Sequence, residues 1–417
     1  MAVVLSVSLL SMSSCSKILD IPLSKNQVES PVVYADSTTA KSALQGIYFS
    51  LGTPSSATNI YFKNLALYTD EMSYSSTSPV ILQFVQGSLL SENGQNASLW
   101  NSLYNVVYQC NAFIAGMETS STIGTPTKRR LVAEARFLRA FAYHYLVNLY
   151  HHVPLILTTD VNANRLAKQA DKAVVENQII ADLVAAKADL GAVGEGGNRV
   201  RASRIAAGAL LARVYLYQGK WPQAFAEANA IINLPAYQPL PNLGDVFLST
   251  SRETILQVWN PNGFIGDATS LIPSSATAIP QFTISGELWD AFEAADRRKT
   301  QWISVNQVTA GGMTTRYPYF SKYKNRTTNA GRPEYLVAIR LSELYLIRAE
   351  ALAQQPKKAS LVLLPLGTAN DFSRAAGIPL EPADALELLD TPPSDIDLGE
   401  VGGQIFLNMA TGGFGSQ

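Results

Sequence analysis

The chain has 417 residues, 47% of them hydrophobic and 16% charged, so it can bury a large core and form more than one domain. Its 32 Lys and Arg residues against 33 Asp and Glu leave a formal net charge of −1, which excludes the positive field that nucleic-acid binding needs. Two cysteines exclude a disulfide framework and a cysteine-based zinc site.

The N-terminus has the pattern of a bacterial lipoprotein signal peptide. An apolar run over residues 2–10, too short to span a bilayer, is followed by Met12, Ser13, Ser14 and Cys15. We therefore predict a signal peptide and lipobox over residues 1–15, lipidation of Cys15, and a polar tether over 16–36. No Lys or Arg precedes Lys17, so the usual positive start is missing. A buried apolar strand with an ordinary cysteine is the alternative.

Helical periodicity dominates the next 320 residues. Apolar positions at helical spacing predict helices over 37–51 (with Ser37 or Thr38 as N-cap), 97–117, 128–151, 173–192, 203–234 and 339–354. Cys110 falls on an apolar face, so we expect it in the core. Residues 52–96 are rich in Ser, Thr, Asn and Gly and predict a long loop region. Residues 240–335 predict a loop-rich insertion, with a short strand at 254–259.

The segment 203–234 has the spacing of a tetratricopeptide-type helix pair, with Gly219 at the turn. Such pairs usually form scaffolds that present a surface. We therefore predict a mainly α fold: a tetratricopeptide-like helix-pair scaffold with loop-rich insertions. His144, His151 and His152 are the only histidines and lack a metal-binding pattern, so we expect no metal and no cofactor.

Several motifs, in order, resemble the SusD/RagB family. They are Leu19-Asp20-Ile21-Pro22, Ala43-Leu44-Gln45-Gly46-Ile47-Tyr48, Thr69-Asp70-Glu71, Glu134-Ala135-Arg136-Phe137-Leu138-Arg139-Ala140, Asp296-Arg297-Arg298, Lys322-Tyr323 and Arg340-Leu341-Ser342-Glu343-Leu344-Tyr345. The resemblance covers residues 12–355. It implies a lipid-anchored outer-membrane protein, exposed at the cell surface, that captures glycan or peptide fragments and passes them to a SusC-type TonB-dependent transporter.

Sugars stack their apolar face on aromatic rings while amides bind their hydroxyls. Rings in loop-like stretches are therefore the candidate ligand contacts: Tyr74, Trp259, Phe264, Tyr317 and Tyr319. Partly buried packing is the competing interpretation of each. Trp100, Trp221 and Trp289 lie at helical spacing and are assigned to the core. Glu134, Arg136, Arg139, Arg340 and Glu350 lie in scaffold blocks, so we interpret them as ion pairs and not as acid–base catalysts.

The C-terminal segment departs from this pattern. The strings PLGTANDF at 365–372 and NMATGGFG at 408–415 resemble the diacylglycerol/sphingosine-type lipid kinases, in particular their YegS branch. The resemblance implies that Gly367, Thr368, Asn370 and Asp371 form a loop at the mouth of a nucleotide cleft. The GGDGT motif of that family is absent from the chain. We therefore interpret 359–417 as a partial α/β fragment, joined to the SusD-like segment 37–358 by a fused or misassembled reading frame or by a natural insertion.

The sequence is compatible with three functions. The leading one is a non-enzymatic binding lipoprotein that delivers nutrients to a transporter. The alternatives are a lipid kinase, which the missing motif argues against, and a periplasmic scaffold whose helix pairs hold another protein.

Overall fold

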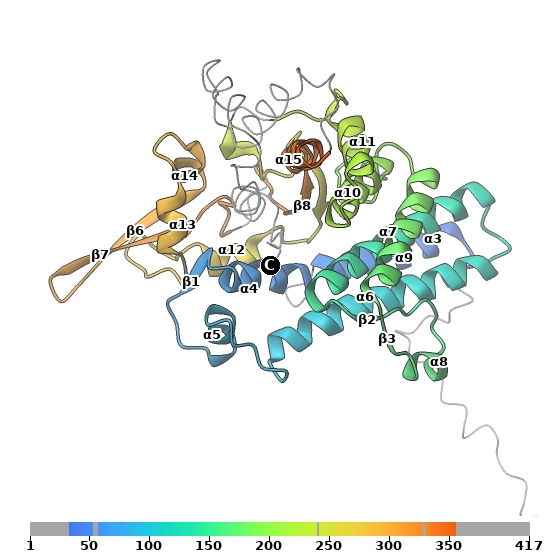
Figure 1. Ribbon diagram of the computed structural model, residues 1–417, viewed down its shortest axis with the longest axis horizontal. Coiled ribbons are helices and arrows are strands. Elements are labelled where there is room, and N and C mark those ends of the chain that lie inside the picture. Colours follow the sequence, from blue (N-terminus) through green and yellow to red (C-terminus); the bar gives the residue numbers. More distant parts are fainter. Residues whose placement is uncertain (1–32, 53–56, 240–241, 328–330, 356–417) are drawn as a thin grey trace, which may run out of the picture.

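The computed structural model describes residues 33–52, 57–239, 242–327 and 331–355, and in these ranges the chain is mainly helical (Figure 1). Among them, no helix has the length and apolar character needed to cross a membrane. The helices are α3 (Ser37–Gly52), α4 (Ala57–Tyr68), α5 (Pro79–Val85), α6 (Gly94–Thr119), α7 (Thr125–Tyr150), α8 (Val161–Arg165), α9 (Lys172–Asp189), α10 (Arg204–Tyr217), α11 (Trp221–Ile232), the 3₁₀ turn η2 (Leu243–Asp245), α12 (Ile265–Leu271), α13 (Gly286–Ala291), α14 (Arg297–Gln301) and α15 (Leu341–Ala353).

The strands are short and pair two by two. They are β1 (Met72–Tyr74) with β5 (Phe282–Ile284), β2 (Val153–Pro154) with β3 (Gln169–Ala170), β4 (Thr254–Val258) with β8 (Leu336–Arg340), and β6 (Ile303–Ala310) with β7 (Met313–Phe320). Every pair is antiparallel. In the described residues the strands therefore form four separate two-stranded sheets beside the helices.

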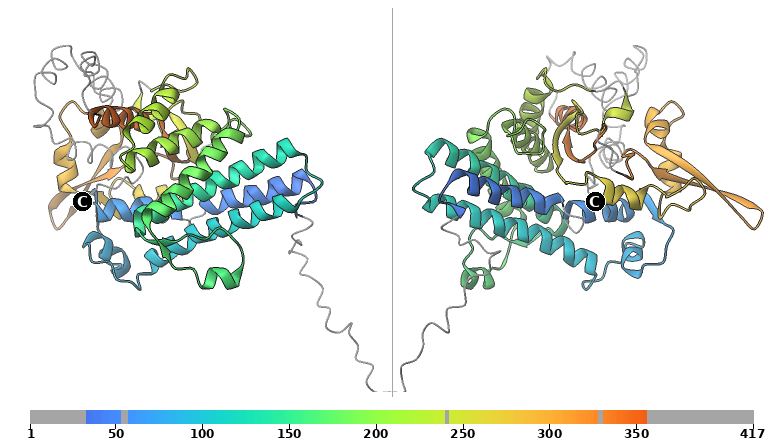
Figure 2. Two further views of the ribbon diagram at one scale, coloured as in Figure 1. Left: turned by 45° about the vertical axis from the view of Figure 1, so that its right-hand side comes forward. Right: turned by 180° about the vertical axis from the view of Figure 1, so that it is seen from behind.

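The scaffold is a series of helices that each pack on the next. The long helices α6 and α7 form a hairpin with α3 beside them, and the series continues through α9, α10, α11 and α15 (Figures 1 and 2). The turn between α10 and α11 contains Gly219 at a φ of 67°, a left-handed conformation that favours glycine. This is the helix-pair scaffold that the sequence predicts.

Helix α7 lies at the centre. Pro126 lies in its first turn, where its missing N–H costs no hydrogen bond. From Leu131 to Val147 nearly every side chain is buried, as expected for a helix covered on all sides. The helix ends at His151, whose φ is 62°, and β2 with Pro154 follows.

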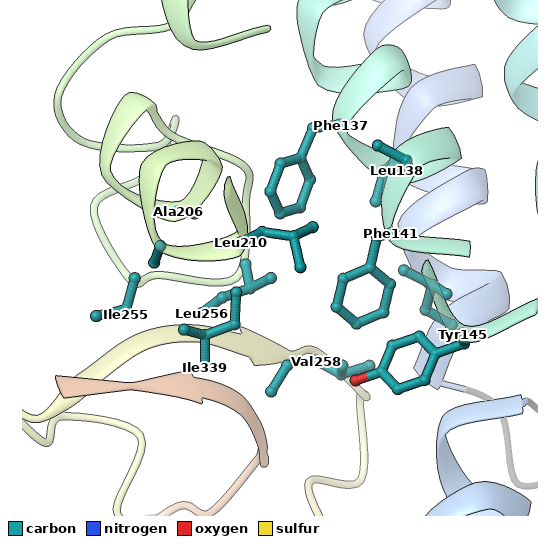
Figure 3. Close-up of a cluster of buried hydrophobic side chains, with 14 of the residues drawn as sticks. Phe137, Leu138, Phe141, Tyr145, Ala206, Leu210, Ile255, Leu256, Val258 and Ile339 are labelled. Atoms are coloured by element: carbon teal, nitrogen blue, oxygen red, sulfur yellow. The ribbon is translucent and has the colours of Figure 1, made fainter. Parts of the chain in front are cut away.

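A buried apolar cluster joins the helices to the β4–β8 pair (Figure 3). Phe137 and Phe141 of α7 face Leu210 of α10, with Leu256 of β4 and Ile339 of β8 closing the cluster; all five are at most 5% exposed. Burial of a side chain of this size contributes about 1.5–3 kcal/mol. The two halves of the chain therefore share one core.

Buried ion pairs connect elements that are distant in the sequence. The Glu134 carboxylate lies 2.7 Å from Nε of Arg201, and Arg139 holds Asp182 at 2.7 Å. Arg340 of β8 pairs with Glu253 just before β4, at 3.2 Å. The interpretation as ion-paired scaffold residues is confirmed for Glu134, Arg139 and Arg340, whereas Arg136 and Glu350 form no salt bridge with another described residue. Removing one partner of such a pair leaves a buried charge uncompensated and typically costs about 3–5 kcal/mol.

The β6–β7 hairpin extends away from the body (Figures 1 and 2). Its strands pair in register from Ile303 with Phe320 to Ala310 with Met313, and Gly311 and Gly312 at positive φ form the two-residue turn. At its base, the Asn306 amide donates to the Ser275 and Ala278 carbonyls at 2.8 and 2.7 Å. The sequence predicts irregular loops in this region, and the hairpin corrects that prediction.

The predicted helices are confirmed, but two further local predictions are wrong. Residues 52–96 are not one long loop, because α4, β1 and α5 lie within it, and Phe62, Leu65 and Leu67 of α4 are buried. The α3 N-cap is Asp36, not Ser37 or Thr38, because its carboxylate accepts the Thr38 and Thr39 N–H groups at 2.6 and 3.2 Å. These hydrogen bonds lower the Asp36 pKa.

Candidate ligand-binding surface

The five aromatic residues that the sequence predicts as ligand contacts lie in different parts of the structure. Phe264 is buried, and its ring stacks on Tyr323 with 3.9 Å between centroids. It therefore packs in the core and offers no free face. Trp259 is half-buried beside Phe49 of α3, with 6.3 Å between ring centroids.

Tyr74, Tyr317 and Tyr319 belong to the strands around the hairpin base. Tyr74 in β1 packs against Phe282 of β5 at 5.3 Å between centroids, and Gln281 donates to its hydroxyl at 3.4 Å. Tyr317 and Tyr319 are two residues apart on β7, so they lie on the same face of the hairpin. Asn306, which pairs with Tyr317 across the hairpin, lies on that face too. All three tyrosines are half-buried. They remain a predicted contact region.

A second group of rings lies at the start of α6. Trp100 and Tyr104 are four residues apart on that helix, with 4.8 Å between centroids, and Tyr150 at the end of α7 meets Trp100 edge-on at 4.9 Å. All three rings are half-buried. We call these three residues the aromatic platform.

Hydrogen bonds hold the platform in one arrangement. The Tyr104 hydroxyl donates to the Pro154 carbonyl at 2.7 Å, and the Tyr150 hydroxyl donates to the Asn96 side-chain oxygen at 3.0 Å. Burial raises the pKa of both tyrosines, so both phenols stay neutral at physiological pH. The rings are therefore oriented before any ligand arrives, which reduces the ordering cost of binding.

Amide side chains lie close to the platform. Gln95 and Asn96 in the first turn of α6 are partly accessible, and the preceding loop exposes Leu90 and the acidic Glu92. A ring surface edged by amides and hydroxyls suits a ligand with an apolar face and many hydroxyl groups.

The helical spacing of Trp100 predicts a core position. Trp100 does pack against the core, yet it keeps an accessible part. Its position shortly after a loop, between polar neighbours in the sequence, is the one feature that indicates an accessible ring. Its pairing with Tyr150, fifty residues away, is visible only in the fold.

Within the described residues, no group of three His, Cys, Asp or Glu side chains could hold a metal ion. His144 is buried, and burial lowers its pKa well below the usual value. His151 and His152 are exposed neighbours. Cys110 is buried as expected, and burial raises its pKa.

Residues in the family-like motifs serve the scaffold. Glu71 follows α4, and its carbonyl accepts the Ser285 N–H at 3.1 Å, while Lys322 after β7 lies over the Phe247 ring at 5.4 Å. Removal from water raises the Glu71 pKa to about 7 and lowers the Lys322 pKa to about 8, each opposed by the charge of the other. These residues connect the helical body to the β-strands.

Cys15 and the kinase-like residues Gly367, Thr368, Asn370 and Asp371 lie outside the described residues. Lipidation and the role of that loop stay predictions. The same holds for the boundaries at residues 15, 36 and 358.

Comparison with known proteins identifies the fold. A family model described as "starch-binding associating with outer membrane", of the SusD-like type, matches residues 24–216. A SusD superfamily protein from Bacteroides thetaiotaomicron is 20% identical with a TM-score of 0.75, covering 90% of this chain and 86% of that one. A laminarin-binding SusD-like protein is 24% identical with a TM-score of 0.66, covering 90% and 94%. The described fold is the SusD fold.

The C-terminal stretch matches a different kind of protein. A diacylglycerol kinase catalytic-domain model matches residues 348–401. A probable YegS-like lipid kinase from Pseudomonas fluorescens Pf0-1 is 87% identical over 69 residues, which are 16% of this chain. A second, from Pseudomonas aeruginosa PAO1, is 72% identical over 69 residues. The chain spans 23% of the length of these relatives. The sequence thus joins a SusD-like part to a lipid-kinase-like part.

Proposed function

We propose that this protein, whose described residues have the SusD fold, binds a neutral polysaccharide at the outer membrane and delivers it to a SusC-type TonB-dependent transporter. The aromatic platform is the observation that carries the binding proposal. Three rings, two of them fixed by hydrogen bonds, lie beside amides and hydroxyls with no ion pair among them. A sugar ring can stack on such a surface while its hydroxyls bond to the amides.

Neutral glucans are the first ligands to test. Starch is named in the description of the matching family and laminarin in the name of one similar structure. A near-zero net charge gives the chain no global attraction for acidic polysaccharides. A peptide ligand remains the alternative and belongs in the same panel.

Affinity electrophoresis in gels containing starch or laminarin tests this proposal. We expect at least one of the two to retard the purified protein. Trp100→Ala should weaken the retardation roughly threefold to tenfold, since a stacking contact contributes about 0.5–1.5 kcal/mol. Equal mobility of the wild type in gels with and without either glucan would count against the proposal.

The membrane location rests on Cys15 and on the description of the matching family. We expect a cell-surface outer-membrane lipoprotein whose Cys15 carries the acyl chains. Metabolic labelling with a fatty acid should mark the wild type and leave Cys15→Ala unlabelled. Label retained in Cys15→Ala would contradict the assignment.

We propose that the protein is not an enzyme. A lipid kinase would transfer phosphate from ATP to diacylglycerol, and we expect no transfer by the full-length chain because the GGDGT motif is absent. A periplasmic scaffold, the other alternative, would bind none of the polysaccharides.

We further propose that a fused or misassembled reading frame created the join. The kinase-like match begins at residue 348, inside α15, which packs on α10 and α11 of the SusD-like body. Long-read sequencing across the codons for residues 340–365 should show that the SusD-like and the kinase-like parts belong to different genes. An unbroken natural join would refute this origin.

A further inference from the structure

Helix α6 continues past the aromatic platform with another ring on its outer side. Tyr108 lies eight residues after Trp100, a rise of about 12 Å along the helix axis, and 52% of its surface is exposed. Tyr108 therefore lies on the solvent-facing side of α6, where its ring is accessible to a ligand.

Beyond Tyr108 the same helix forms the floor of a groove of about 590 Å³. The floor consists of small residues, Ala112, Ala115 and Gly116. Its edges are the segment Tyr34–Ala35, the turn after α6 and Thr159 from the loop that precedes α8. Every lining residue belongs to the described part of the chain.

Packing and hydrogen bonds hold Tyr34 in place at one edge of the groove. A Cβ atom at Gly116 would lie 2.0 Å from the Tyr34 ring, so the ring rests directly on the helix backbone. The Tyr34 ring meets Phe113 edge-on at 5.8 Å, and its hydroxyl donates to the Ala112 carbonyl at 3.3 Å. Ser120 donates its hydroxyl to the Tyr34 carbonyl at 2.7 Å. The groove is therefore defined before binding.

The lining of the groove is neutral. It contains no Asp, Glu, Lys, Arg or His; hydroxyl groups come from Tyr34, Tyr108, Thr119, Ser120, Ser121, Thr122 and Thr159. Ring faces together with hydroxyls, without charge, suit the same ligand class as the aromatic platform. At the edge of the groove, the Lys128 ammonium donates to the Ser120 carbonyl at 2.5 Å.

We propose that this groove is a second sugar-binding subsite, with Tyr108 as its stacking ring. The inference rests on the proposed glucan-binding function and extends it: one polysaccharide chain contacts the aromatic platform and the groove together. Tyr104 of the platform lies one helical turn, about 6 Å along the axis, from Tyr108, whereas Ala115 on the groove floor lies about 16 Å from Tyr104. A short oligosaccharide bound at the platform therefore does not extend along the groove floor. Long chains therefore bind more tightly than short ones through the added contact.

Tyr108→Ala tests the subsite, with Tyr68→Ala as the matched control. Tyr68 ends α4 and is 48% exposed, so both substitutions remove a similarly accessible ring. Calorimetry compares a long glucan with a trisaccharide of the same linkage. We expect Tyr108→Ala to weaken long-glucan binding roughly threefold to tenfold and trisaccharide binding less. Tyr68→Ala should change neither.

A second variant, Ala115→Glu, places bulk and charge in the groove without removing a ring. It should weaken long-glucan binding in the same direction. Wild-type affinity of both Tyr108→Ala and Ala115→Glu for the long glucan would overturn the subsite, as would equal weakening of the trisaccharide. No glucan binding by the wild type would instead reject the function on which the subsite depends.

Discussion

At Gly116, which the Tyr34 ring contacts, helix propensity and packing have opposite effects on the stability of a Gly116→Ala variant. Alanine is favoured over glycine inside a helix by about 0.5–1 kcal/mol, so Gly116→Ala should stabilise α6 itself. The added Cβ would lie 2.0 Å from the Tyr34 ring, however, and the ring must leave. It then loses its edge contact with Phe113 and its hydrogen bond to Ala112, about 0.5–1.5 kcal/mol each.

We therefore expect Gly116→Ala to detach Tyr34 while the helical core stays folded. Losing about 1–3 kcal/mol of local stability should speed chymotryptic cleavage after Tyr34 roughly 5- to 100-fold. Gly46→Ala is the control, because nothing lies within 4 Å of a Cβ at that helical glycine. It should raise the urea midpoint of unfolding and leave cleavage unchanged. Unaltered cleavage after Tyr34 in Gly116→Ala would refute the contact.

Two further predictions concern the scaffold. Tyr48→Phe removes a hydroxyl that donates to Glu134 at 2.9 Å and accepts the Ala202 N–H at 2.8 Å, so the free energy of unfolding in urea should fall by about 1–3 kcal/mol. The control, Tyr317→Phe on β7, should change the free energy of unfolding little. Equal stability of the two variants would contradict this role of the Tyr48 hydroxyl. Because the folded protein raises the Glu71 pKa from 4.5 to about 7, the folded state binds the proton more tightly, and the contribution of Glu71 to stability should decline as the pH rises from 4.5 to 7. Glu71→Gln should flatten that part of the stability profile, and an unchanged slope would show that Glu71 does not titrate in this way.

Local patterns predict the helical scaffold well because its helices are long and periodic. The positions of α7 and of the α10–α11 pair follow from apolar spacing, Pro154 and Gly219. The sequence does not predict helix α4, because the segment that contains it is rich in uncharged polar residues typical of a loop, although Phe62, Leu65 and Leu67 pack inward.

The candidate site depends on contacts between distant residues, which a single sequence does not reveal. Trp100 has core-like spacing, and only the end of α7 brings Tyr150 against it. Phe264 lies in a loop-like stretch and is nevertheless buried, since the fold places it between Phe62 and Tyr323. Ring positions therefore follow from tertiary packing more than from loop composition.

Calorimetric titration of a neutral glucan into matched tryptophan variants tests the central claim most directly. Trp100→Ala changes the aromatic platform, whereas Trp221→Ala changes a half-buried ring on α11. The account predicts that the wild type and Trp221→Ala bind starch or laminarin with similar affinity and that Trp100→Ala binds more weakly. Equal affinities of all three proteins, or no binding by the wild type, would contradict it.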